Sequence, residues 1–420
     1  MYIGHMASFS LECRCGERYH VDDSQVGRQL VCRGCGNRLE IRRPAETVPP
    51  SRSSARDSKV RRRRSRPTRD TNKPASAYPL TVPRTGRWRI AAVLAWGYLV
   101  AALLIAALLW GLGDRNTLGT VLLFMGRWVF LLPLVVLVPL VAWLRARMLL
   151  PLAAGALVVI GPVMGFRTGW RRLLPAPEGE HVRVVSFNAG GNQMPAQMLP
   201  AELDRWHAQI VGIQECTGAL AEAAPRIPGW HVHVSRDLCF LTRYPIREAA
   251  VMDRSALDRI KRSDADQPGG AGYVVRFVLD GPGGPIRAAN LHLETPRKGL
   301  EGLMSGDRRR MSNNTDIRGI ESSLAREWVS DGTGPLLVLG DFNTPVESAF
   351  FRDRWGDLTD AFSVAGTGFG ITKYNGWIGA RIDHVLASDE WHVDRAIVDA
   401  QRLSDHRALI VDLTLRAGAR

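Results

Sequence analysis

The sequence predicts a mixed α/β domain over residues 180–420, preceded by a cysteine-rich module and a helical transmembrane region. Three observations carry this prediction. Apolar strand-like runs alternate with helical patterns in residues 180–420, as in α/β folds. Residues 10–45 hold four of the six cysteines. Residues 89–166 are overwhelmingly apolar, which is typical of membrane-spanning helices.

The cysteine-rich module at residues 10–45 has the spacing of a structural zinc site. Cys13 and Cys15 form one close pair, and after 16 further residues Cys32 and Cys35 form a second. Two such pairs suit tetrahedral Zn²⁺, and so short a segment lacks a core without metal. We therefore expect a zinc-ribbon-like module, with free or disulfide-linked cysteines as the alternative. Whether it binds nucleic acid, a protein or only its metal stays open.

Residues 46–88 predict a disordered basic linker. They include four consecutive arginines, 61–64, and few apolar side chains, so they cannot bury a core. Nucleic-acid or anionic-lipid binding is one interpretation. We favour a topology signal beside a membrane span, because Lys and Arg concentrate on the cytoplasmic side.

The transmembrane region at residues 89–166 predicts about three helices. The apolar stretches are 90–113, 118–144 and 148–165, and Arg127 interrupts the second. The basic linker and the arginines 145 and 147 indicate a cytoplasmic N-terminus. Three crossings then place the C-terminal domain outside the cytoplasm. If the third stretch is only interfacial, that domain is cytoplasmic.

The net charge of +14 does not by itself predict a nucleic-acid-binding protein. Residues 1–88 carry 19 Lys and Arg against 8 Asp and Glu, whereas residues 180–420 carry 28 against 31. The excess positive charge therefore lies before and around the membrane region. Six cysteines in 420 residues also exclude a disulfide-dense secreted scaffold.

Polar side chains end or follow several predicted strands of the C-terminal domain. They occur in short motifs that read Ser-Phe-Asn188, Gln-Glu215, Asn-Leu-His292, Gly-Asp341-Phe-Asn343, Arg-Ile-Asp383-His and Ser-Asp405-His406. In this order, over about residues 182–415, they make the chain resemble the endonuclease/exonuclease/phosphatase superfamily. The resemblance implies a four-layer α/β/β/α sandwich, with the active site at one end of its two mixed sheets.

Oxygen and imidazole groups of this kind suit metal-assisted hydrolysis of phosphate esters. We expect Mg²⁺ or Mn²⁺ on Glu215 as principal ligand, supported by Asn188 and with a contribution from Asp405. Asp341 and Asn343 suit positioning or deprotonation of the attacking water.

The two histidines of these motifs have different expected roles. His406 is the candidate general base or phosphate contact, and the resemblance implies that Asp383 fixes its tautomer. His292 would donate to a non-bridging phosphate oxygen, and Asp237 is a candidate to orient it. His384 more often packs than reacts.

The substrate is less well specified. Arg297 and Lys298 could face it, whereas 308–310 reads as the solvated start of a helix. Cys216 and Cys239 could form a disulfide, but two buried thiols are the favoured expectation. DNA, a phospholipid or another phosphodiester would each fit.

The sequence therefore predicts an integral membrane phosphoesterase that resembles phosphodiesterases and nucleases. The competing hypothesis is a membrane scaffold with an inert C-terminal domain. Its zinc ribbon and basic tail would bind nucleic acid or a protein partner.

Overall fold

The computed structural model describes residues 8–42, 84–191, 193–257 and 273–418. The chain divides into two compact units, Met1–Tyr78 and Pro79–Arg420. Most of the predicted linker at 46–88 lies outside the described residues. Its last part is wrong as a linker, because residues 84–88 already belong to helix α1 (Arg84–Gly111). Here the guanidinium of Arg87 donates to the carbonyl of Trp143 and lies over its ring, which fixes the helix start.

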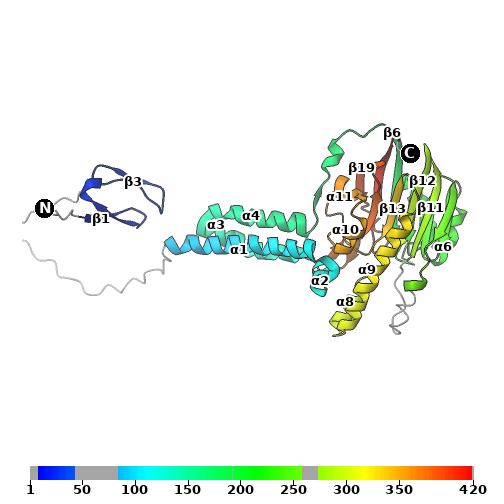
Figure 1. The fold of residues 1–420 in the computed structure, drawn as a ribbon, viewed down its shortest axis with the longest axis horizontal. Coiled ribbons are helices and arrows are strands. Elements are labelled where there is room, and N and C mark those ends of the chain that lie inside the picture. Colours follow the sequence, from blue (N-terminus) through cyan, green and yellow to red (C-terminus); the bar gives the residue numbers. More distant parts are fainter. Residues whose placement is uncertain (1–7, 43–83, 192, 258–272, 419–420) are drawn as a thin grey trace, which may run out of the picture. The chain divides into compact units, whose positions relative to one another are not determined.

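The first unit consists of two short β-hairpins (Figure 1). Strands β1 (Ser8–Glu12) and β2 (Arg18–Asp22) pair antiparallel, as do β3 (Gln29–Val31) and β4 (Arg38–Glu40). A cysteine pair occupies the turn of each hairpin. Gly16 and Gly36 follow these cysteines with φ of 91° and 76°, a left-handed conformation that glycine adopts without steric cost.

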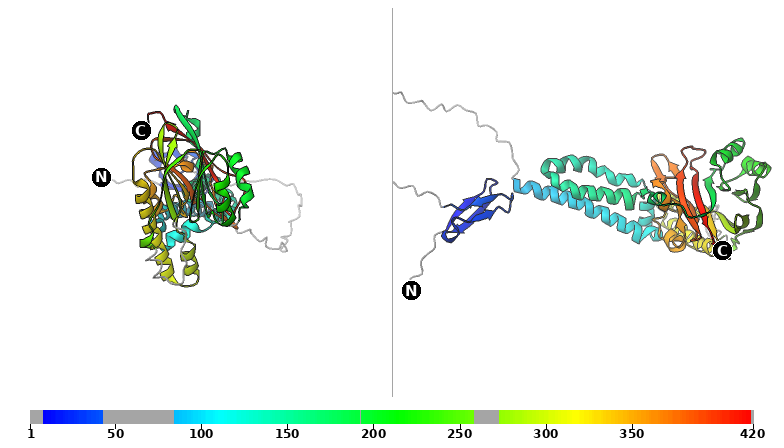
Figure 2. Two further views of the ribbon diagram at one scale, coloured as in Figure 1. Left: turned by 90° about the vertical axis from the view of Figure 1, so that its right-hand side faces the viewer. Right: turned by 90° about the horizontal axis from the view of Figure 1, so that it is seen from above.

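The second unit begins with apolar helices, of which two segments are long and apolar enough to cross a membrane, Gly86–Gly111 and Arg127–Val163. The second is divided by Arg145, whose φ of −164° and ψ of 100° are extended. This break separates α3 (Leu132–Arg145) from α4 (Leu149–Val158). Both contact α1, and Figures 1 and 2 show the three helices side by side.

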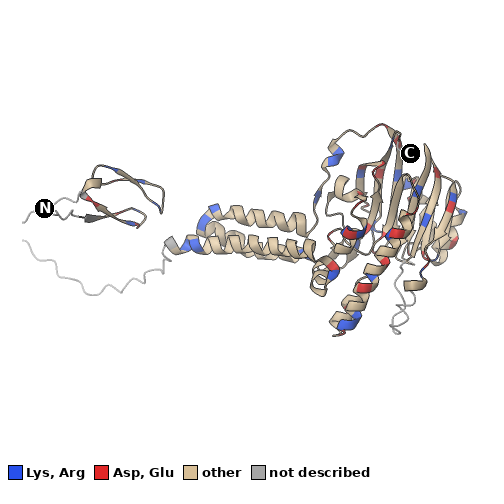
Figure 3. Cartoon of the chain, in the orientation of Figure 1, with Lys and Arg blue, Asp and Glu red and all other residues tan. Residues whose placement is uncertain are grey.

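The expected continuous helix over 118–144 is wrong. Residues Thr117–Phe124 form a separate short helix, α2, because the backbone is extended at Met125. Arg127 forms a buried ion pair with Glu347 of the C-terminal domain at 3.1 Å. Figure 3 shows the long helices almost free of charge between their ends.

The C-terminal domain contains two six-stranded mixed sheets. The first sheet has the order β19 (Trp391–Val398), β20 (Leu409–Arg416), β6 (Gly179–Asn188), β7 (Ile210–Gln214), β9 (Leu238–Thr242) and β8 (His231–Ser235). The second has the order β10 (Ile246–Val251), β11 (Tyr273–Gly281), β12 (Gly284–His292), β13 (Leu336–Asp341), β18 (Asp383–Ala387) and β14 (Thr359–Asp360).

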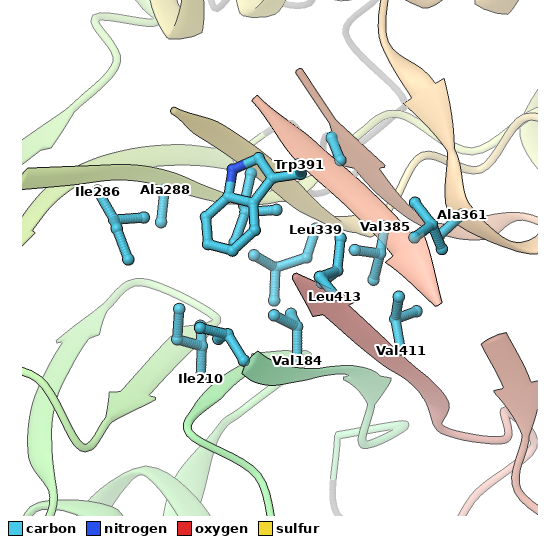
Figure 4. Close-up of a cluster of buried hydrophobic side chains, with 14 of the residues drawn as sticks. Val184, Ile210, Ile286, Ala288, Leu339, Ala361, Val385, Trp391, Val411 and Leu413 are labelled. Atoms are coloured by element: carbon cyan, nitrogen blue, oxygen red, sulfur yellow. The ribbon is translucent and has the colours of Figure 1, made fainter. Parts of the chain in front are cut away.

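A hydrophobic core lies between the two sheets (Figure 4). Val184 of the first sheet and Leu339 of the second are both fully buried in it, and Phe240 stacks on Phe277 with ring centroids 4.0 Å apart. Alternate strand residues point to opposite faces. Val185 and Val338 therefore enter separate outer cores, beneath α5 (Leu199–Trp206) and α10 (Ala349–Trp355) respectively. The two sheets and flanking helices agree with the expected α/β class.

The long helix α9 (Arg308–Ser330) completes the outer layer beside the second sheet and pairs with α8 (Arg297–Met304). Two smaller elements matter for the site. The hairpin of β16 (Lys373–Asn375) and β17 (Ile378–Ala380) precedes β18, and the loop holding His406 precedes β20.

The C-terminal domain is joined to the helical region by buried polar contacts. Asp114, in the turn after α1, lies 3.0 Å from the guanidinium of Arg318 on α9. Its carboxylate also accepts hydrogen bonds from the hydroxyl of Ser348 and the backbone N–H of Phe350. Both charged side chains are almost fully buried, so α1 and the domain share one packed junction.

Candidate active site

The candidate active site lies where strands of both sheets end together. In the second sheet, His292 pairs in register with Asp341, and Asp341 pairs with Asp383. In the first, Asn188 pairs with Gln214, the residue before Glu215. The order of strands therefore brings together side chains from five separate motifs.

Asn188 connects the acidic groups of the two sheets. Its Nδ2 donates to Glu215 Oε1 at 3.1 Å and to Asp341 Oδ2 at 3.0 Å, and its Oδ1 accepts from the N–H of Gly190. The amide thus directs its donors toward the two carboxylates.

His292 is held by Asp237, the partner that the sequence suggested. Asp237 Oδ2 lies 2.9 Å from His292 Nδ1, which leaves Nε2 at 3.8 Å from Asp341 and 4.0 Å from Glu215. Burial alone would lower the pKa of His292. The hydrogen bond that His292 donates to Asp237 and the charges of the three surrounding carboxylates outweigh burial and raise this pKa to about 9.

A second histidine–aspartate pair faces the same carboxylate. His406 Nδ1 lies 2.8 Å from Asp383 Oδ2, and its Nε2 lies 3.7 Å from Asp341 Oδ2. Burial opposes a charged imidazole, but the charge and hydrogen bond of Asp383 raise the pKa of His406. Oδ2 of Asp341 therefore lies between two imidazoles, each fixed by its own aspartate.

Asp341 is itself an unusual carboxyl group. It is buried, and burial together with the charge of Asp383 raises its pKa despite the two histidines. Its Oδ1 accepts a hydrogen bond from the N–H of Asn343 at 2.8 Å. The pKa shift makes Asp341 a better proton acceptor than an exposed aspartate.

Two of the site residues have a left-handed backbone. Glu215 has φ of 49° and Asn343 has φ of 48°. The conformation costs a non-glycine residue about 1–2 kcal/mol and is concentrated at functional sites. In Asn343 it directs Nδ2 to the carbonyl of Leu293 at 2.9 Å, which joins the ends of β12 and β13.

A buried amide pair lies beneath the site, between the sheets. Gln214 Nε2 donates to Asn290 Oδ1 at 2.7 Å, and Asn290 Nδ2 donates to the carbonyl of Cys239. Because both side chains are buried, these bonds fix the spacing of the two sheets directly below Glu215 and His292.

The expectation of two buried thiols at Cys216 and Cys239 is wrong. These residues form a disulfide. It is adjacent to Glu215, and the N–H of Cys216 also donates to the carbonyl of Asp237 at 2.9 Å. Cys239 lies opposite Ile213 in the pairing of β7 with β9, and Cys216 lies two residues after the end of β7. The disulfide therefore ties the segment of Glu215 to that of Asp237.

Asp405 lies outside this constellation. Its carboxylate forms an ion pair with Lys373 of the β16 strand, and its backbone N–H donates to Gln193 Oε1. Metal ligation by Asp405 therefore stays a prediction, and in this structure the residue positions Lys373 at the pocket.

A pocket of about 920 Å³ opens over the site. Glu215, His292, Asp341 and His406 line it. Arg297 and Lys298 lie on its wall, as the sequence suggested for substrate-facing residues. The Arg297 side chain is 75% exposed and that of Lys298 is 17% exposed beside Glu294.

His384 is buried away from the pocket, as expected for a packing residue. Its Nδ1 lies 2.8 Å from Asp360 and its Nε2 lies 3.0 Å from the carbonyl of Thr344. Both ring nitrogens are thus used inside the fold.

The pocket residues Phe124 and Tyr273 were missed from the sequence, whereas Lys373 belongs to the loop 366–380 that the sequence suggests for specificity. Tyr273 is the register partner of His292, which a correct pairing of β11 with β12 would have indicated. Phe124 belongs to the apolar region before the domain, and no local pattern connects it with the site.

The donor set fits a divalent cation. Glu215 and Asp341 share the amide of Asn188, so two carboxylates lie close together. Carboxylate oxygens are the ligands that Mg²⁺ and Mn²⁺ prefer. Asp341, Asp383 and His406 also present ligand atoms within 4.8 Å of one another.

The four cysteines of the first unit fit a metal as well. Their sulfur atoms all lie within 4.8 Å of one another, with Cys13 3.6 Å from Cys35 and Cys15 3.3 Å from Cys32. Tetrahedral zinc with bonds of 2.3 Å places sulfurs about 3.8 Å apart. The hydroxyl of Tyr19 donates to Cys32 and lowers its pKa to about 6, which favours the thiolate needed as a ligand.

Residues 185–406 match the Endonuclease/Exonuclease/phosphatase family. Among solved structures, TDP2 of D. rerio complexed with single-strand DNA product is 12% identical, covering 56% of this chain and 99% of that chain, with a TM-score of 0.42. A family protein from Bacteroides thetaiotaomicron is 18% identical, covering 57% and 99%, with a TM-score of 0.42. None of the curated proteins compared with the chain matches it.

Proposed function

This chain belongs to the Endonuclease/Exonuclease/phosphatase family, and we propose that it is a membrane-anchored, divalent-metal-dependent enzyme that hydrolyses phosphodiester bonds. One observation carries the proposal. Two histidines, each held by an aspartate at 2.8–2.9 Å, face the same buried carboxylate of Asp341 across one pocket. Such an arrangement provides proton donors and a proton acceptor around one phosphate group.

His292 is the proposed donor to the phosphate. Because its pKa is raised to about 9, the imidazole is protonated at neutral pH. Asp237 accepts at Nδ1, so the Nε2–H is free to donate to a non-bridging oxygen and stabilise the charge that develops there.

Asp341 is the proposed acceptor of the proton from water. Its raised pKa improves it as a base, and the N–H of Asn343 keeps its orientation fixed. His406 either contacts the phosphate or exchanges this proton through Nε2, which lies 3.7 Å from Asp341. Asp383 holds the His406 tautomer in which Nε2 points to the pocket.

Mg²⁺ or Mn²⁺ would be held by Glu215, with Asn188 orienting that carboxylate. When bound, the ion would neutralise phosphate charge and favour ionisation of a bound water. Glu215 is suited to this position because its side chain is 39% exposed, whereas Asp341 and Asp383 are buried.

The proposed anchor consists of α1, α3 and α4. Arg87 near the start of α1 contacts Trp143 near the end of α3, whereas Trp110 near the end of α1 donates to the carbonyl of Pro162 after α4. α1 and α4 therefore run parallel and α3 runs in the opposite direction. Three crossings would place the domain on the side opposite residue 84, outside a cytoplasm that holds the basic N-terminus.

The Cys216–Cys239 disulfide supports this orientation, because disulfides persist mainly in oxidising compartments. A reporter fused after Arg420 tests it in cells. Periplasmic or extracellular reporter activity is expected, and a cytoplasmic signal would contradict three crossings.

The catalytic proposal is tested on the purified full-length protein in detergent, with bis(p-nitrophenyl) phosphate and Mg²⁺ or Mn²⁺. Glu215→Ala and His406→Ala should each lower kcat/KM by about 100-fold or more, the usual effect of losing an acid–base or metal-binding group. His392→Ala is a matched control, because His392 also pairs with an aspartate, Asp394, but does not line the pocket. Losses below tenfold in both site variants would contradict the assignment.

The second candidate function is a membrane scaffold with an inert C-terminal domain. The Cys13, Cys15, Cys32 and Cys35 cluster supports it, since zinc ribbons commonly bind macromolecules. Zinc-dependent capture of nucleic acid or protein by the full chain, together with no hydrolysis over a broad phosphate panel, would favour it. Zinc-independent capture with metal-dependent hydrolysis would favour the enzyme.

A further inference from the structure

We infer that the pocket takes its substrate from the bilayer, and that this substrate is a phospholipid whose phosphodiester enters while its acyl chains stay in the membrane. The inference rests on the proposed membrane-anchored phosphoesterase activity and specifies its substrate. The hydrolysis is balanced: water adds to phosphorus, one P–O ester bond breaks, and the departing oxygen takes a proton. The products are one alcohol and one phosphate monoester.

Part of the pocket wall belongs to the membrane-proximal region. Phe124, the last residue of α2, lines the same pocket as His292 and His406. α2 is the apolar helix between the two candidate membrane-spanning segments. A substrate at the reacting groups therefore lies beside an element that adjoins the bilayer.

The position of α2 beside the pocket is fixed by contacts with the C-terminal domain. The buried pairs Asp114–Arg318 and Arg127–Glu347 join both ends of the α2 segment to the C-terminal domain. In addition, Trp128 Nε1 donates to the carbonyl of Trp377, in the turn of the β16–β17 hairpin. That hairpin supplies Lys373 to the pocket. The mouth of the pocket is thus held against the membrane helices from two sides.

The rim of the pocket carries exposed apolar side chains. Met304, at the end of α8, lines the pocket and is 89% exposed, and Ile378 of the hairpin lines it and is 40% exposed. Trp377 beside it is 90% exposed. Soluble surfaces rarely gather large apolar side chains in this way, whereas the apolar boundary of a bilayer stabilises them.

Basic side chains accompany this apolar rim. Arg297 begins α8 and lines the pocket, and the exposed residues Arg308 and Arg309 begin α9 directly after the α8 turn. Lys and Arg next to apolar residues at a membrane surface attract anionic headgroups. The combination fits a lipid phosphate better than a neutral ligand.

The same features argue against a nucleic-acid strand. Single-strand binding uses an extended basic groove with stacked aromatic side chains. Here residues 180–420 carry slightly more acidic than basic side chains, 31 against 28. Glu215, Asp237 and Glu301 also line the pocket itself. The basic side chains that line the pocket are Arg297 and Lys298 of α8 and Lys373 of β16.

The test compares two substrates with the full-length protein reconstituted in vesicles of equimolar phosphatidylcholine and phosphatidylglycerol. One substrate is the vesicle lipid. Its hydrolysis is measured both as phosphate monoester released into the water and as lipid products extracted from the vesicles. The other is bis(p-nitrophenyl) phosphate, which has no acyl chain. Single-stranded DNA is assayed in parallel.

Lipid hydrolysis above the rate with DNA is expected. Met304→Ser should lower the ratio of kcat/KM on lipid to kcat/KM on bis(p-nitrophenyl) phosphate about tenfold, which corresponds to about 1.4 kcal/mol. Phe124→Ser should change the ratio in the same direction. Because Met304 is highly exposed, its substitution is not expected to unfold the protein. Val251→Ser, at a 45% exposed residue of β10 outside the pocket, should leave the ratio unchanged.

Each outcome is decisive. Hydrolysis of bis(p-nitrophenyl) phosphate without lipid hydrolysis, faster cleavage of DNA, or an unchanged ratio in Met304→Ser would overturn the lipid inference and leave the phosphoesterase proposal standing. Hydrolysis of none of the three substrates with either metal would overturn the phosphoesterase proposal itself.

Discussion

Replacing Asp114 with alanine should loosen the junction between α1 and the C-terminal domain. The Asp114 side chain is fully buried, and it lies 3.0 Å from a guanidinium on Arg318 that is 2% exposed. It also accepts hydrogen bonds from Ser348 and from the N–H of Phe350. Asp114→Ala therefore leaves a buried cation without this partner and removes the acceptor of two further donors.

The expected cost can be worked from these contacts. Removing one partner of a buried ion pair typically destabilises a protein by about 3–5 kcal/mol. For a domain of this size each kcal/mol lowers the unfolding midpoint by roughly 2–4 °C, so a decrease of roughly 6–20 °C is expected. Replacing both charges, as in Asp114→Leu with Arg318→Leu, should cost less than Asp114→Ala, because no buried charge is then left unpaired.

The assay is thermal unfolding of the full-length protein in detergent, followed by near-ultraviolet circular dichroism. Asp353→Ala is the matched control. Asp353 pairs with Arg115, the residue next to Asp114, but these side chains are 42% and 53% exposed. An exposed pair contributes only about 0–1 kcal/mol. Equal shifts for Asp114→Ala and Asp353→Ala would refute the reasoning that burial of this ion pair holds the junction together.

Three further predictions concern the rest of the chain. Reduction of the Cys216–Cys239 disulfide, which closes a loop with a sequence separation of 23, should destabilise the domain by about 3 kcal/mol. Thermal unfolding with and without dithiothreitol measures this loss, and the unfolding midpoint of the double Cys→Ser variant should not change with dithiothreitol. Burial raises the pKa of Asp360, but the charge of Arg381 outweighs it and holds this pKa well below its usual range. The stability that Asp360 contributes is therefore present above the ordinary Asp pKa of about 4 and is lost as the pH falls. In urea unfolding, the free energy of unfolding should decrease less on acidification in Asp360→Asn than in the wild type, and equal decreases would contradict this pH dependence. Chelation of zinc should make residues 8–42 sensitive to protease, and Cys32→Ser should lower the amount of bound zinc measured by mass spectrometry. Unchanged resistance of residues 8–42 to protease after chelation would indicate a metal-independent fold.

Much of the site was predictable because its residues lie in short local patterns. A buried strand such as β13 has consecutive apolar residues followed by a polar end, and that pattern marks Asp341 from sequence alone. The same holds for Asn188 and His292, the last residues of β6 and β12. Each strand carries its own polar terminus, so the motifs can be recognised before their pairing is known.

Other features depended on contacts between distant segments. The Arg127–Glu347 pair joins the start of the second apolar segment to the C-terminal domain, so a hydropathy pattern predicts only an interrupted span there. The disulfide joins Cys216, just after β7, to Cys239 of the neighbouring strand β9, and no local pattern connects the two residues. The motif of Asp405 predicts metal ligation, and only the tertiary structure shows that its carboxylate pairs with Lys373 of β16.

The sequence by itself determined the kinds of parts: a thiol cluster, apolar helices long enough to cross a bilayer, and strands with polar ends. These are set by composition and by periodicity within one segment. Only the tertiary structure decided how the parts meet: one carboxylate oxygen of Asp341 between His292 and His406, and Phe124 beside them. The physical reason is that strand order and buried ion pairs are selected by the free energy of the whole packed domain, which no local pattern encodes.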